Sequence, residues 1–215
     1  MNIIIRFIIL STVFASDLDS DISFRYGVLG RLASQEEAIT VLQDSSLIYS
    51  DDYIRINVGY QKETHFYVIY KGSQGEYMLL YPEERKAVAN IVDLPDTIYT
   101  TVLHWSKLTD PTGYETFFIL NSNFELENLL ALLKRYDQVN AKGKIKLAKK
   151  IQYELDDLNP ETKQDLASIV SHLDKPVVGG VSFRGDADGL KDISLTHSCA
   201  GKFDLAFKKI VLNHQ

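Results

Sequence analysis

The sequence predicts a mostly β protein: an antiparallel β-sandwich-like domain of about seven to nine strands, with an α-helical insertion of two to three helices. Short apolar segments that alternate with polar residues recur between turn residues in the first half of the chain and again near its C-terminus. Between them, the apolar spacing changes to that of amphipathic helices. We therefore expect residues 16–122 to form the first part of the β domain, residues 123–174 the helical insertion, and residues 175–215 the strands that complete the domain.

The first residues differ from the rest of the chain. A start with one positive charge, Arg6, precedes a compact apolar run over residues 7–14, and Ala15 closes the run before Ser16. This is the layout of a secretory signal peptide, and the run is shorter than the roughly 20 apolar residues that a membrane span needs. A buried first strand is the alternative. We expect residues 1–15 to be a signal peptide and the mature chain to be exported, periplasmic or secreted, and not membrane-spanning.

Composition and charge exclude some classes of partner. The 215 residues include 23 Lys and Arg against 29 Asp and Glu, which gives a formal net charge of -6. Nucleic-acid binding in general needs a surplus of cations to neutralise phosphates, so no nucleic-acid partner is expected. The single cysteine, Cys199, cannot form a disulfide within the chain.

The strands and one helix of the first part follow from local patterns. Gly72 and Gly75 lie in a loop between two β-prone segments, which predicts a hairpin, and Pro82 ends the second of these strands because proline has no N–H. Ser34 and Glu37 form a capping box, which predicts a helix to about residue 44. The strands are expected at residues 22–29, 53–58, 65–70, 76–81, 98–105 and 114–120.

The helical insertion and the last strands follow in the same way. Asn123 is the expected cap of a first helix, residues 142–158 are a second helix, and Pro160 begins a third that ends near residue 173. The closing strands are expected at residues 177–183, 193–197 and 203–212, with a bulge at Lys208 and Lys209 where the apolar register changes.

Several motifs occur in a fixed order along the chain. They are the segment 50–55, the strand 66–70, the segment 75–82 that ends in Tyr-Pro, Asn90, Leu94-Pro95, and the segment 110–122 that ends in Ser. The set resembles the bacterial family known as domain of unknown function 4384, over about residues 47–133 and more loosely at 180–184 and 208–214. The resemblance implies an accessory β module, here standing alone behind a signal peptide, and implies no activity of its own. Tyr81 stands where the family usually has Phe, and the helical insertion is longer than the core domain.

The candidate site is a corner formed by Trp105, Asp110, Gly113 and Glu115. It is either an interaction site or a structural corner, in which Asp110 and Gly113 form the turn and Glu115 accepts backbone hydrogen bonds. We favour the structural role for the three turn residues, and expect most aromatic residues to fill the core.

Three other sequence patterns indicate alternative binding or catalytic sites. His197 and Cys199 lie on one face of a strand and could act as base and nucleophile, although a lone strand cysteine is usually a small buried apolar residue. Asp186 and Asp188, with Asp192 nearby, resemble part of a calcium loop. One helix carries a run of lysines that would suit an anionic membrane surface or an acidic partner, or would simply be solvated; they are Lys142, Lys144, Lys146, Lys149 and Lys150.

No catalytic residue, cofactor or metal ligand is assigned from the sequence. The expected function is that of an exported, non-catalytic binding module that recognises a protein or a cell-envelope component. The alternatives are a hydrolase that uses Cys199 with His197 and a calcium-stabilised structural domain.

Overall fold

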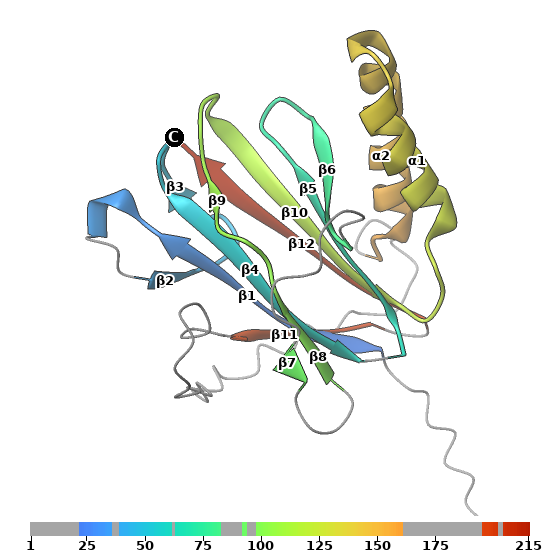
Figure 1. The fold of residues 1–215 in the computed structure, drawn as a ribbon, viewed down its shortest axis with the longest axis horizontal. Helices are drawn as coiled ribbons and strands as arrows, with labels where there is room; N and C mark the ends of the chain where they lie inside the picture. Colours follow the sequence, from blue (N-terminus) through green and yellow to red (C-terminus); the bar gives the residue numbers. More distant parts are fainter. Residues whose placement is uncertain are drawn as a thin grey trace, which may run out of the picture.

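The computed structural model describes residues 22–35, 39–61, 63–82, 92–93, 98–160, 195–201 and 204–215. Within these residues the chain is mostly β with two α-helices, as the sequence predicts (Figure 1). The strands are β1 (Ser23–Arg31), β2 (Ile39–Leu42), β3 (Leu47–Ile48), β4 (Tyr53–Gln61), β5 (His65–Lys71), β6 (Tyr77–Tyr81), β7 (Val92–Asp93), β8 (Ile98–Val102), β9 (Ser106–Lys107), β10 (Gly113–Ser122), β11 (His197–Ala200) and β12 (Leu205–His214). The helices are the 3-10 helix η1 (Ala33–Gln35), α1 (Glu127–Gln138) and α2 (Ala141–Leu158).

The strands form two sheets. Sheet A has the order β11-β1-β4-β8-β7, with β2 also paired to β1 and β9 to β4, and all of these pairs are antiparallel. Sheet B has the order β3-β12-β10-β5-β6. Its centre is β10, which pairs antiparallel with β12 on one side and β5 on the other, and the short β3 pairs parallel with β12. Strands distant in sequence are thus joined along β10 and β12.

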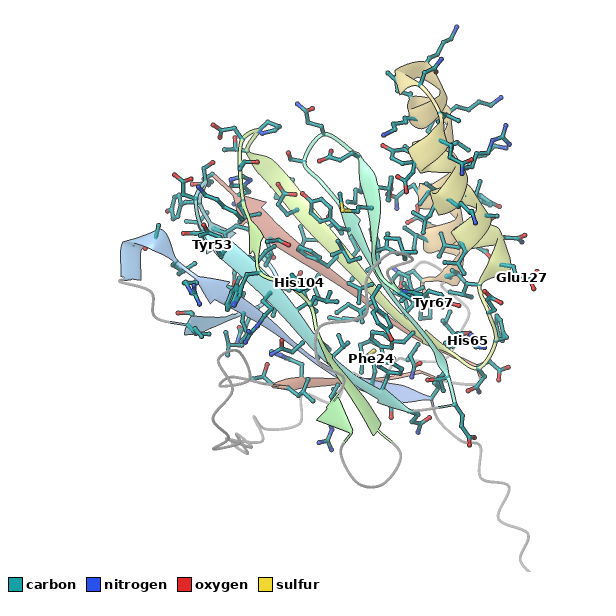
Figure 2. The ribbon with its side chains drawn as sticks, viewed as in Figure 1. Phe24, Tyr53, His65, Tyr67, His104 and Glu127 are labelled. Atoms are coloured by element: carbon teal, nitrogen blue, oxygen red, sulfur yellow. The ribbon has the colours of Figure 1, made fainter. Side chains whose placement is uncertain are left out.

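One apolar core lies between the two sheets. Phe24 of β1 (labelled in Figure 2) and Tyr60 of β4 both contact the ring of Phe66 on β5, at centroid distances of 5.5 and 4.5 Å. Aromatic side chains thus link sheet A to sheet B. On β1, β4, β5 and β10 every second residue supplies this face, because successive side chains of a strand point to opposite sides. The buried members include Val28, Ile54, Ile56, Val58, Val68, Phe117, Ile119, Ile210 and Leu212.

A second apolar core lies between sheet B and the helix pair. Leu129, Leu133 and Tyr136 are spaced three and four residues apart in α1, and each is buried. The matching stripe of α2 is Leu147, Ile151 and Leu155. Both stripes pack with the sheet residues Tyr67, Ile69, Tyr77, Phe118, Leu120 and Phe207. The helices therefore cover one face of sheet B, as Figure 1 shows.

Polar contacts fix the helix pair at specific points. The Gln152 side-chain carbonyl in α2 accepts hydrogen bonds from Lys71 Nζ at 2.8 Å and from the Tyr77 hydroxyl at 2.7 Å. The Tyr67 hydroxyl, which lies beside the start of α1 (Figure 2), accepts a hydrogen bond from Leu126 N–H at 3.2 Å. Burial raises the pKa of the Tyr67 and Tyr77 hydroxyls, so both stay neutral donors or acceptors at ordinary pH.

The helix expected from Ser34 to about residue 44 is wrong. Residues 33–35 form the short 3-10 helix η1, and Ile39–Leu42 is strand β2, paired antiparallel with β1. Ile39, Thr40 and Val41 are all β-branched, which favours a strand, and pairing to β1 satisfies their backbone groups. Residues 36–38, including Glu37 of the expected capping box, lie outside the described part.

The bulge expected at Lys208 and Lys209 is also wrong. The pairing of β12 with β10 runs without interruption from Leu205 to His214. Ala206 faces the core between the sheets, while Phe207 packs against the helices. The apparent change of register arises because β12 is covered on both faces at this end.

Several other boundaries differ from expectation. Asn123 does not cap α1: its N–H donates to Asp204 O, and the helix begins after Leu126 without a side-chain cap. The strand expected at 193–197 is instead His197–Ala200. Strand 98–105 ends at Val102 and a short β9 follows it. The expected third helix, strand 177–183 and signal peptide 1–15 lie outside the described residues. Within the described part, no helix is long and apolar enough to cross a membrane.

Candidate functional site

Glu115 is a buried carboxylate near the start of β10, with 2% of its surface exposed. The Tyr70 hydroxyl of β5 donates a hydrogen bond to Glu115 Oε2 at 2.5 Å. The other oxygen, Oε1, lies 3.1 Å from Nδ1 of His214, which is 1% exposed at the end of β12. Burial, followed by the hydrogen bond to Glu115, raises the pKa of Tyr70 well above its usual range, so Tyr70 stays a donor. The three side chains come together because β10 pairs with both β5 and β12.

Ser50 extends this cluster to the surface. Its Oγ lies 3.1 Å from His214 Nε2 and donates a hydrogen bond to Asp110 Oδ1 at 2.9 Å. The turn that carries Ser50 is held on both sides, because Asp52 Oδ2 accepts from Tyr49 N–H at 2.8 Å and Asp51 N–H donates to Leu108 O at 3.0 Å. A continuous series of polar contacts thus runs from the core to the surface. We call it the polar relay: Tyr70, Glu115, His214, Ser50 and Asp110.

The structure brings together two of the predicted site residues, Asp110 and Glu115, through Ser50 and His214. We expected Glu115 to accept hydrogen bonds from backbone groups. In the structure its two oxygens instead contact the side chains of Tyr70 and His214. Gly113 has a φ of 146°, which side-chain-bearing residues rarely adopt. A Cβ there would lie 2.7 Å from Ser73 Cβ, so the turn requires glycine for both conformation and space.

Trp105, the fourth predicted site residue, belongs to a separate cluster. The guanidinium carbons of Arg31 and Arg55 lie 4.9 and 4.6 Å from the Trp105 ring centroid. Both distances are within the range of cation–π attraction, and arginine is the usual partner for tryptophan. Trp105 is therefore held by two strands of sheet A and is partly exposed.

His197 and Cys199 each have partners in the structure. The His197 ring stacks on Tyr26 at a centroid distance of 5.2 Å and its Nδ1 lies 2.7 Å from the Thr196 hydroxyl. Cys199 Sγ lies 3.5 Å from the Phe207 carbonyl oxygen and packs against the core between the sheets. Burial, followed by the charge of Lys208, lowers the pKa of His197. These contacts do not pair the imidazole with the thiol.

The residues of the expected calcium loop, Asp186, Asp188 and Asp192, lie outside the described part of the chain. Among the residues that the structure describes, no three His, Cys, Asp or Glu side chains gather closely enough to hold a metal ion.

A groove runs along the solvent side of the helix pair. Its volume is about 640 Å³, within the range that ligand-binding clefts occupy. Three cations, Arg135, Lys149 and Lys150, line it together with one carboxylate, Glu154. We call it the basic groove; it is lined by Asn128, Ala131, Leu132, Arg135, Lys149, Lys150, Tyr153 and Glu154.

Sequence reasoning identified the lysines of this groove but not its α1 wall or the relay residues Ser50 and His214. Ser50 and His214 lie 164 positions apart, and no spacing rule connects such residues. Comparison with known proteins adds nothing to these sites, since no family model, curated protein or solved structure matches the chain. The resemblance to domain of unknown function 4384 therefore stays a prediction.

Proposed function

We propose that this chain is an exported binding module with a β-sandwich-like fold, in which the basic groove binds an acidic segment of a protein or cell-envelope component. The observation that carries the proposal is the groove itself, a concave surface with three cations and one anion. These cations form a locally positive surface, although the formal net charge of the whole chain is -6. A local charge opposite to that of the whole molecule favours a partner with complementary charge.

The lysines of α2 extend the positive surface beyond the groove. At 100° per residue, Lys142, Lys146, Lys149 and Lys150 fall on one side of the helix, and all four are exposed. That side is opposite the buried stripe of Leu147, Ile151 and Leu155. An extended acidic chain that lies along α2 would therefore meet cations over about two helical turns.

Aromatic and apolar surface lies within the same region. Tyr153 lines the groove and is 71% exposed, and Ile145, one turn before Lys149, is 66% exposed. Large exposed side chains of this kind cost free energy in water, and tyrosine is enriched at protein interfaces. The combination favours a polypeptide partner, which supplies both carboxylates and apolar side chains, over a simple anion.

The walls of the groove are held in place by the second core. Ile151 and Leu155 are fully buried beneath α2, and Leu129 and Leu133 are buried beneath α1. Gln152, next to the groove residue Tyr153, is fixed by Lys71 and Tyr77 of sheet B. A surface held in this way loses little conformational entropy when a partner binds.

The test uses a fluorescein-labelled peptide that repeats the sequence Glu-Leu-Glu. Its binding to the purified chain is measured by fluorescence anisotropy. We expect binding that weakens as salt is added, because the contacts are exposed ion pairs. Reversal of two groove charges in K149E/K150E should weaken it roughly tenfold or more. The matched control is R25E/K209E, which makes the same change in net charge at exposed residues of β1 and β12.

Equal losses in the two double variants would contradict a groove-specific site and indicate a net-charge effect. Binding to vesicles with anionic lipid but not to the peptide would replace the polypeptide partner with a membrane surface. Export is tested separately on the tagged chain in a bacterial host. Cleavage near Ala15 and recovery outside the cytoplasm are expected, and an uncut cytoplasmic chain would contradict this part of the proposal.

A further inference from the structure

The polar relay contains the three groups of a nucleophilic site in the required order. Ser50 Oγ lies 3.1 Å from His214 Nε2, and His214 Nδ1 lies 3.1 Å from Glu115 Oε1. Nucleophile, base and orienting carboxylate within hydrogen-bond reach of one another are the general signature of covalent catalysis by serine. We propose that Ser50 is a nucleophile activated by His214 and positioned by Glu115, and that the chain reacts at its surface with esters of carboxylic acids.

The partners of Glu115 decide which imidazole nitrogen faces Ser50 as an acceptor. Tyr70 donates to Oε2, so Oε1 is the oxygen that accepts from His214 Nδ1–H. With the proton on Nδ1, Nε2 of the neutral ring is a lone-pair acceptor directed at Ser50. The side chains of His214 and Glu115 are 0% and 3% exposed, so water does not compete for either contact.

Ser50 itself is reachable from solvent. It is half-buried in the turn between β3 and β4, at the corner where the C-terminus is marked in Figure 1. Among the described residues its N–H has no hydrogen-bond acceptor, whereas those of Asp51 and Asp52 donate to Leu108 O and Tyr49 O. The Ser50 N–H is therefore the donor that remains for a developing oxyanion.

Asp110 restrains this site. Ser50 has one hydroxyl proton, and Asp110 Oδ1 at 2.9 Å competes for it with His214 Nε2. The Asp110 carboxylate also opposes the negative charge that forms on the substrate oxygen. The reactive arrangement requires the Ser50 hydroxyl to turn from Asp110 to His214, so removal of the Asp110 carboxylate should increase reactivity.

The covalent step is balanced by these groups alone. Ser50 Oγ attacks the ester carbonyl carbon, and its proton passes to His214 Nε2. The carbon–oxygen bond to the alcohol then breaks, and the alcohol leaves with the proton from Nε2. Water attacks the acyl-Ser50 carbonyl through the same imidazole, which releases the acid and restores the serine.

The test is labelling of the purified chain with a fluorophosphonate probe, which transfers its phosphonyl group to an activated serine with loss of fluoride. One adduct on Ser50 is expected by mass spectrometry, and none in Ser50→Ala. Asp110→Ala should label severalfold faster. Glu115→Gln, whose amide donates to Nδ1 and so moves the ring proton to Nε2, should label roughly a hundredfold more slowly while retaining the native circular dichroism spectrum.

Absence of labelling in both the native chain and Asp110→Ala would overturn the proposal. So would a Glu115→Gln variant that keeps the native rate, because Glu115 would then play only a structural role.

A second measurement uses the variant Ser50→Cys in a Cys199→Ser background, with Ser34→Cys as the exposed control. Below pH 7, iodoacetamide should alkylate the Ser50→Cys variant at least roughly tenfold faster than the Ser34→Cys control. Equal rates in the two variants would contradict activation by His214. The helix pair lies on the other side of the molecule in Figure 1, so peptide binding should be unchanged in Ser50→Ala.

Discussion

Removal of the Glu115 side chain tests how the polar relay contributes to stability. Glu115→Ala would leave the half-buried Tyr70 hydroxyl and the buried His214 Nδ1 without their partner. A buried polar group that loses its hydrogen bond costs about 1–3 kcal/mol. With the full range for His214 and about 1 kcal/mol, the lower limit, for the half-buried Tyr70 hydroxyl, the expected loss in the free energy of unfolding is about 2–4 kcal/mol. This corresponds to a drop in Tm of roughly 4–16 °C for a chain of this size.

The control keeps the hydrogen bonds and removes the charge. The Glu115→Gln amide accepts from Tyr70 and donates to His214, so its loss should be about 1 kcal/mol. Urea unfolding followed by the fluorescence of Trp105, the single tryptophan, gives the free energy of each variant. A Glu115→Ala chain within about 0.5 kcal/mol of the native value would show that the hydrogen bonds of Glu115 do not stabilise the fold, and equal losses in the Ala and Gln variants would contradict these hydrogen bonds.

Three further predictions concern the helices and His197. Tyr67→Phe removes the buried acceptor for the N–H of Leu126, the residue just before α1, and should cost about 1–2 kcal/mol in urea unfolding; an unchanged midpoint would contradict that contact. Asn140→Ala removes the side-chain cap that accepts from Gly143 N–H and should cost about 1 kcal/mol, whereas Asn140→Asp should restore most of it. The lowered pKa of His197 means that the unfolded chain binds its proton more readily, so His197 contributes stability above pH 6.5 that is lost as pH falls. Tm measured from pH 8 to 5 should therefore fall less steeply in His197→Gln than in the native chain.

The local parts of the fold could be predicted from the sequence because their signals are local. The hairpin of β5 and β6 follows from two β-prone segments around Gly72 and Gly75, and β6 ends at Tyr81, before the proline. The helix α2 follows from the spacing of Leu147, Ile151 and Leu155. In each case the residues that decide the structure lie within one element.

The wrong predictions of a helix after Ser34 and of a bulge in β12 have a common physical cause. In both places, contacts with distant parts of the chain determined the structure. Ser34 begins a good capping box, yet the residues from Ile39 pair with β1 as a strand. The apolar pattern of β12 is irregular because one face meets sheet A and the other meets the helices at Phe207. A single-sequence pattern cannot show which face will be covered by a second layer.

The candidate site also contains residues that local patterns identify and residues that only tertiary contacts bring together. Asp110 and Gly113 were identifiable because turn residues have strong local preferences. Ser50 and His214 were not, because their contact depends on the pairing of β3 and β10 with β12. The lysines of α2 were visible as a run, but the groove exists only because Arg135 of α1 packs beside them.

Hydrogen–deuterium exchange with and without the acidic peptide tests the central claim, that the helix pair is the binding surface. We expect slower exchange in Glu127–Gln138 and Ala141–Leu158 when the peptide is present, and no change around Trp105 or Ser50. Protection that appears instead on sheet A beside Trp105, with α1 and α2 unaffected, would contradict binding at the helix pair and assign it to the Arg31 and Arg55 cluster.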